Sequence, residues 1–151
     1  GIEYGVGRKV KAVLQGKTTG LDTHRLRCLF TGAVHTCHRL YRAGVLHGNW
    51  CRCCGQLEVG TLDHLVNCCS ATAHLRHRDF TEEEWAGLPM CLRLHGISPL
   101  GDDWLPPRLA EGDRAKEGVV GDVQYALIDM LAAHRQSLEG EVAPAQPRWR
   151  G

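Results

Sequence analysis

The chain has 151 residues, a length for one domain, and its 18 glycines against few aromatic residues predict a modest hydrophobic core. The formal net charge is +1, and no apolar run approaches the ~20 residues of a membrane span, so we expect a soluble protein. Residues 1–20 carry four cationic side chains and no apolar stretch, so we expect no signal peptide there. Adjacent cysteine pairs favour a reducing, intracellular compartment over a disulfide scaffold.

Charge is unevenly distributed along the chain. Residues 1–80 contain eleven Lys or Arg and five Asp or Glu, whereas residues 81–151 contain seven and twelve. This balance of +6 against −5 predicts either that the basic half binds a polyanion or an acidic partner, or that the two halves attract each other. We divide the chain into a basic N-terminal extension (1–20), a helical zinc-binding domain (21–80), a helical acidic extension (81–136) and a flexible tail (137–151).

Two short helices are predicted before the cysteine-rich segment. Apolar residues keep a helical spacing over Leu26–Ala33. Thr36 is then the N-cap of a second helix, which ends at Gly44. Arg39 and Arg42 lie on the outer side of this second helix, where they either contact phosphates or form a solvated face.

The segment 50–69 holds five of the eight cysteines. Cys51 and Cys54 form a C-x2-C pair followed by Gly55, whose backbone freedom suits a tight turn that aims two thiolates at one ion. With His64 and one further cysteine they supply the closed tetrahedral shell of a structural Zn2+ site. The alternatives are a disulfide pair or reduced thiols buried as small apolar side chains.

The fourth ligand of this predicted zinc site is either Cys68 or Cys69. On an α-helix that starts near Thr61, His64 and Cys68 lie one turn apart on the same face, which favours Cys68. If the helix ends near Asn67, Cys69 can turn back toward the ion instead. The residues alone leave both alternatives open.

Motifs on both sides of the cysteine pair carry a family resemblance. They are Thr31-Gly32-Ala33, Arg39-Leu40, Gly44, Cys51, Cys54, Gly55, Thr61-Leu62 and His64-Leu65, followed by a cysteine. Over about residues 21–80 the chain thereby resembles the zinc-binding segment that follows the reverse transcriptase domain in non-LTR retrotransposon polyproteins. The resemblance implies a module that holds RNA or target DNA, and the family's usual H-x4-C spacing implies Cys69 as the fourth ligand.

A helix over 71–77 is predicted to expose a basic surface next to the cysteine-rich segment. Arg76 and Arg78 belong to this surface. Together with Arg39 and Arg42 they are our candidate contacts to the phosphates of RNA or DNA.

Short helices and loops are predicted for the acidic half. A capping box at Thr81 and Glu84 opens one short helix, and Pro89 begins another. Residues 97–121 are predicted to form a loop. Gly121–Arg135 has the clearest apolar stripe and is the best single helix, and an extended tail follows it.

The predicted fold is mainly α: a small helical domain organised around a Cys/Cys/His/Cys zinc knuckle, with long loops and an extended C-terminal tail. The first functional hypothesis is a zinc-binding, nucleic-acid-binding module derived from a retroelement reverse transcriptase, in which Trp50 either stacks on a base or packs the knuckle. The alternative is a zinc-stapled structural subunit whose partners are the proteins of a larger assembly. No phosphate loop, nucleophile motif or paired carboxylates indicate an enzyme.

Overall fold

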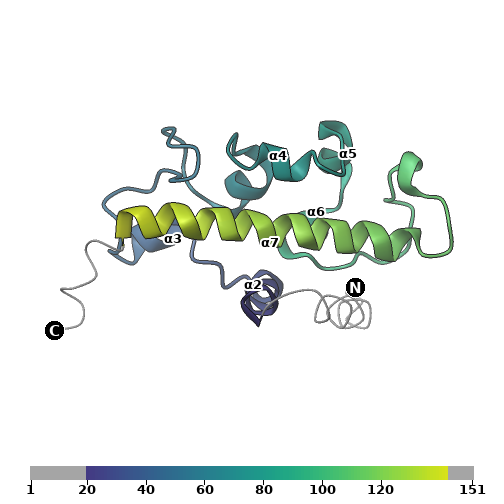
Figure 1. Cartoon of the computed structure of the whole chain (residues 1–151), viewed down its shortest axis with the longest axis horizontal. Coiled ribbons are helices and arrows are strands. Elements are labelled where there is room, and N and C mark those ends of the chain that lie inside the picture. The colour runs from purple at the N-terminus through teal and green to yellow at the C-terminus, as the bar shows by residue number, and fades with distance from the viewer. Residues whose placement is uncertain (1–19, 143–151) are drawn as a thin grey trace.

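The computed structural model describes residues 20–142, and Figure 1 shows them as short helices arranged around one long helix, α7. Residues 1–19 of the predicted N-terminal extension (1–20) and residues 143–151 of the predicted tail (137–151) lie outside the described residues, whereas residues 137–142 of that tail belong to α7. The elements in chain order are α2 (Gly20–Thr31), α3 (Cys37–Arg42), the π-helical turn η1 (His64–Cys68), α4 (Ala73–Arg76), α5 (Glu82–Gly87), α6 (Met90–His95), the 3-10 turn η2 (Pro107–Leu109) and α7 (Ala115–Val142).

The mainly helical fold class is confirmed. Between residues 20 and 142, the β-type pairing consists of one isolated antiparallel bridge, between Trp50 and Val59. None of the helices in this part of the chain combines the length and apolar character that crossing a membrane requires.

Several predicted helix ends are confirmed because local chemistry fixes them. The hydroxyl of Thr36 accepts a hydrogen bond from the Arg39 N–H and caps α3. Thr81 and Glu84 form the predicted capping box of α5, with bonds of 3.1 Å and 2.9 Å. The end of α6 is set by Gly96, whose φ of 66° places it in the left-handed region.

α7 is longer than predicted at both ends: it begins at Ala115 and ends at Val142 instead of spanning Gly121–Arg135. The predicted loop over 97–121 is therefore wrong in part, since it contains η2 and gives way to α7 at Ala115. Glycine in a helix costs about 1 kcal/mol relative to alanine, and Gly118 and Gly121 weaken the helical pattern there. Val119 and Val120 are buried in the core, and their packing carries the helix through this weak region. Leu138 is buried as well, which extends the helix beyond the predicted end.

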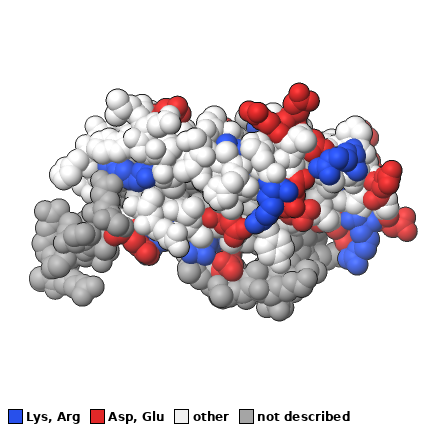
Figure 2. Space-filling view, turned by 45° about the horizontal axis from the view of Figure 1, so that its top comes forward, with Lys and Arg blue, Asp and Glu red and all other residues white. Residues whose placement is uncertain are grey.

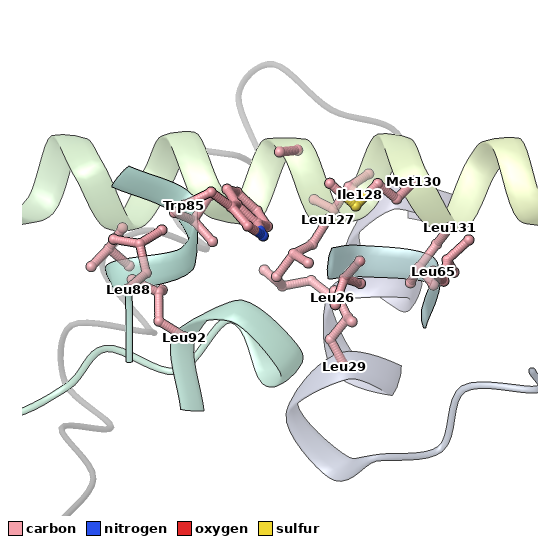
Figure 3. Packing of buried hydrophobic residues seen from close by; sticks show 14 of the residues in the cluster. Leu26, Leu29, Leu65, Trp85, Leu88, Leu92, Leu127, Ile128, Met130 and Leu131 are labelled. Carbon is pink, nitrogen blue, oxygen red and sulfur yellow. The ribbon is translucent and has the colours of Figure 1, made fainter. Parts of the chain in front are cut away.

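One apolar core joins α7 to most of the other helices. α2, α4, α6 and η1 all contact α7. Figure 3 shows Leu26 and Leu29 from α2, Leu65 from η1 and Leu127 from α7 converging in this core. Trp85 of α5 packs edge-on against Phe80, with ring centroids 5.7 Å apart. Because Leu65 belongs to this core, the π turn η1 is packed against the core and is not a loose loop.

A second, small cluster packs α3 against the loop that follows it and against the end of α7. It consists of Cys37, Leu46 and Leu138, with Leu40 beside it. Gly60 of the cysteine-rich segment packs closely against α3, since a Cβ atom there would lie 2.6 Å from the Cβ of Cys37. The segment also contacts α7, where Cys53 Sγ lies 3.5 Å from the Ser137 hydroxyl.

Candidate metal centre

The first half of the site is a tight turn that presents Cys51 and Cys54. The N–H of Gly55 donates to the carbonyl of Cys51 at 3.2 Å, and Gly55 has a φ of 69°. The N–H of Cys51 donates to the carbonyl of Glu58 at 2.9 Å, next to the Trp50–Val59 bridge. This short hairpin holds both thiols on the same side, as the C-x2-C-G pattern predicts.

The second half is the π turn η1, and it decides which cysteine faces the site. The N–H of Cys69 donates to the carbonyl of His64 at 2.7 Å, a bond between residues five apart rather than four. The wider turn places His64 and Cys69 together, whereas an α-helix would pair His64 with Cys68. Cys69 is fully buried and Cys68 is exposed.

The structure brings together the four residues predicted as ligands. One ligand atom each from Cys51, Cys54, His64 and Cys69 lies within 4.8 Å of all the others. The Sγ atoms of Cys51 and Cys69 are 3.8 Å apart, and Cys54 Sγ lies 3.5 Å from His64 Nε2. Cys68 is not part of this group.

These separations fit a tetrahedral metal centre and not a disulfide. Metal–sulfur bonds of about 2.3 Å and metal–nitrogen bonds of about 2.0 Å give tetrahedral edges of about 3.8 Å between sulfurs and about 3.5 Å between sulfur and nitrogen. A disulfide would need sulfur atoms about 2.05 Å apart. The group therefore has the donor types and the spacing of a Cys3His metal-binding cluster.

Glu58 orients the histidine, a role that the sequence analysis missed. Its Oε2 lies 3.0 Å from His64 Nδ1, on the opposite side of the ring from the Nε2 atom that faces Cys54. A carboxylate on the second ring nitrogen fixes the tautomer and raises the basicity of a ligating histidine. A sequence signal existed, because Glu58 is the only carboxylate between Cys51 and Leu62.

Two thiols of the group, those of Cys51 and Cys69, favour the protonated state when no cation is near. Burial raises the pKa of Cys69 to about 11. The pKa of Cys51 is raised by its hydrogen bond with the Cys53 thiol and by burial, and the same bond lowers the pKa of Cys53. A divalent cation reverses this preference, since coordination requires thiolates.

Cys53 lies outside the group of four. Its Sγ is 3.5 Å from the hydroxyl of Ser137 on α7, so it links the cysteine turn to the long helix. Trp50 is half-buried, its ring lies against the Arg52 guanidinium at 3.6 Å from the ring centroid, and a Cβ on Gly48 would collide with the ring.

The four predicted phosphate-binding arginines differ in their surroundings. Arg39 and Arg42 are both exposed. The guanidinium of Arg39 also donates to the carbonyls of Gly32 and Val34. Arg78 is exposed and pairs with Asp79 and Asp129. On the face drawn in Figure 2, cationic side chains are likewise interspersed with acidic ones.

The predicted exposure of Arg76 is wrong. Arg76 is buried, because its guanidinium donates to Thr72 Oγ1 at 2.9 Å and to the carbonyl of Cys69 at 3.1 Å. Burial lowers its pKa, and the nearby Cys69 thiol opposes that shift. The side chain on this short helix turns inward because polar groups beside the cysteines accept its hydrogen bonds.

Fold and site together define the class: a small helical domain that contains a possible Cys3His metal-binding cluster. Comparison of the chain with protein-family models, with curated proteins and with solved structures found no match.

Proposed function

We propose that Cys51, Cys54, His64 and Cys69 bind one Zn2+ as a closed structural centre that staples the cysteine hairpin to the π turn. The observation that carries this proposal is the pair of separations, 3.8 Å between sulfurs and 3.5 Å between sulfur and nitrogen. Three thiolates and one imidazole fill all four positions, leaving none for a substrate. The ion then supplies cross-linking energy and not chemistry.

Metal analysis combined with chelation tests this proposal. Purified protein is expected to contain one zinc per chain. A strong chelator is expected to lower the unfolding midpoint, and added Zn2+ to restore it, because metal binding free energy in such sites is folding free energy, of order 10 kcal/mol. A native preparation that lacks metal, and whose stability is unchanged in chelator, would refute a structural zinc.

We propose as a second function that the zinc-stapled module binds RNA or DNA. It is supported by the exposed positions of Arg39 and Arg42 on α3 and by the +6 balance of residues 1–80. The origin in a retroelement rests on the sequence resemblance. Arg76 contributes no phosphate contact in this proposal, because it is buried, and Arg78 contributes only by leaving its acidic partners.

Salt dependence of binding separates this function from that of a structural subunit in a protein assembly. Each phosphate contact contributes about 0.7–0.9 to the slope of log affinity against log salt, so replacing Arg39 and Arg42 by alanine is expected to reduce the slope by about 1.5. Replacing Arg114 and Arg135 in the acidic half is the matched control. If the wild-type protein binds no nucleic acid even at low salt, the structural-subunit function stands instead.

A further inference from the structure

Arg76 is a buried cation that hydrogen-bonds only to neutral groups. Arg76 is 5% exposed. Its guanidinium donates to the Thr72 hydroxyl and to the backbone carbonyl of Cys69. Buried arginine is rare unless an anion accompanies it, since the charge has lost its hydration. The geometry therefore raises the question of which anion accompanies Arg76.

No carboxylate is in ion-pair contact with Arg76 among residues 20–142. Glu82 acts on it only through space, and more weakly than the thiols of Cys69 and Cys68 do. Of these two thiols, Cys69 belongs to the group of four ligand atoms and Cys68 is exposed. The strongest negative neighbour available to Arg76 is thus the metal centre itself.

We propose that Arg76 is the counter-charge of the metal centre and strengthens metal binding there. The inference rests on the proposed zinc function. Three thiolates, a neutral imidazole and a divalent cation carry a net charge of −1, which the guanidinium neutralises within the buried site. A monovalent cation with the same ligands would leave −2, so the guanidinium would attract that site at least as strongly.

The local structure holds the guanidinium in this place. Thr72 donates its hydroxyl hydrogen to the carbonyl of Leu65 at 2.7 Å, which leaves Oγ1 facing Arg76 as an acceptor. The second acceptor is the carbonyl of Cys69, the residue that also presents a ligand sulfur. Arg76 is therefore a positioning residue: it acts on the ion through Cys69 and through its charge, without touching the ion.

Three substitutions separate charge from hydrogen bonding. Arg76→Met removes both, Arg76→Gln keeps donors without the charge, and Arg76→Lys keeps the charge with different donors. The matched control is Arg78→Met, which removes an exposed cation two residues away. Zn2+ and Co2+ affinities are measured by competition with a chromophoric chelator, and unfolding is measured with and without metal.

The expected result is a loss of about 10–100-fold in Zn2+ affinity for Arg76→Met and Arg76→Gln, a smaller loss for Arg76→Lys, and no loss for Arg78→Met. Arg76→Met is expected to lower the unfolding midpoint of the zinc-loaded protein but not that of the metal-free protein. Cu+ affinity is expected to fall by at least as large a factor as Zn2+ affinity, because the Cu+ site carries the greater negative charge.

Two results would overturn the counter-charge role. One is an Arg76→Gln variant that binds Zn2+ at least as well as Arg76→Lys, because hydrogen bonding would then outweigh charge. The other is equal destabilisation of the metal-free and zinc-loaded forms by Arg76→Met, the signature of a merely structural side chain. Failure of the zinc proposal looks different, since the wild-type protein itself would bind no Zn2+.

Discussion

The choice between Cys68 and Cys69 offers the sharpest test of the site, because the two thiols are adjacent in sequence but differ completely in environment. Cys69 Sγ is buried 3.8 Å from Cys51 Sγ, whereas Cys68 is exposed. A structural zinc site contributes about 10–16 kcal/mol, so one of four ligands accounts for about 3 kcal/mol if the ligands share it equally. Cys69→Ser is therefore expected to weaken Zn2+ binding by about a hundredfold.

Cys68→Ser is the internal control for this experiment. An exposed substitution away from structural features changes stability by about 0.5 kcal/mol or less, so the Zn2+ affinity of this variant is expected to stay within about twofold of the wild-type value. Both variants are titrated against a chromophoric chelator at fixed pH. A hundredfold loss in Cys68→Ser with normal binding in Cys69→Ser would show that His64 pairs with its α-helical neighbour, and the π turn would be refuted.

Three further predictions concern the surroundings of the site. Glu58→Gln is expected to weaken Zn2+ binding by about 10–100-fold because His64 loses its carboxylate partner; unchanged affinity would mean that Glu58 does not orient the ring. The pKa of Cys69 in the metal-free protein is raised, so the free energy of unfolding is retained below pH ~9 and falls as the pH rises toward about 11. In the zinc-loaded protein the free energy of unfolding falls as the pH is lowered, because protons compete with zinc for the ligands. Unfolding midpoints that change with pH in the same direction in both forms would contradict this. Leu92→Ala, in the fully buried core, is expected to cost about 2–5 kcal/mol in denaturant unfolding, and a cost below ~1 kcal/mol would place Leu92 outside the packed core.

Three of the four candidate ligands, Cys51, Cys54 and His64, could be predicted from residue type and spacing, whereas the choice of Cys69 over Cys68 followed only from the family resemblance. Two thiols separated by two residues and followed by a glycine have few uses other than a metal turn. The helix ends were equally local: Thr36, Thr81 and Glu84 place side-chain acceptors where backbone N–H groups need them.

The features that escaped prediction depend on tertiary packing. A π turn leaves no periodic signal, and here Asn67 within it is tied to α5 by the hydrogen bond that Trp85 Nε1 donates at 2.9 Å. The burial of Arg76 depends on acceptors that exist only once the turn before it has folded. The full length of α7 could not be predicted, because the burial of Val119 and Val120 in the core outweighs the low helix propensity of the neighbouring glycines.

The position of α7 at the end of the described chain has a consequence for how the protein forms during synthesis. The main core needs residues of α7, so the preceding helices emerge from the ribosome without the surface against which they pack. The four ligand residues, by contrast, are all present once Cys69 has emerged. If zinc binds as proposed, the nascent chain captures the ion first and acquires resistance to proteolysis later. Ribosome-stalled chains exposed as far as α6 are then expected to hold zinc yet remain open to protease, and those exposed through α7 to resist it.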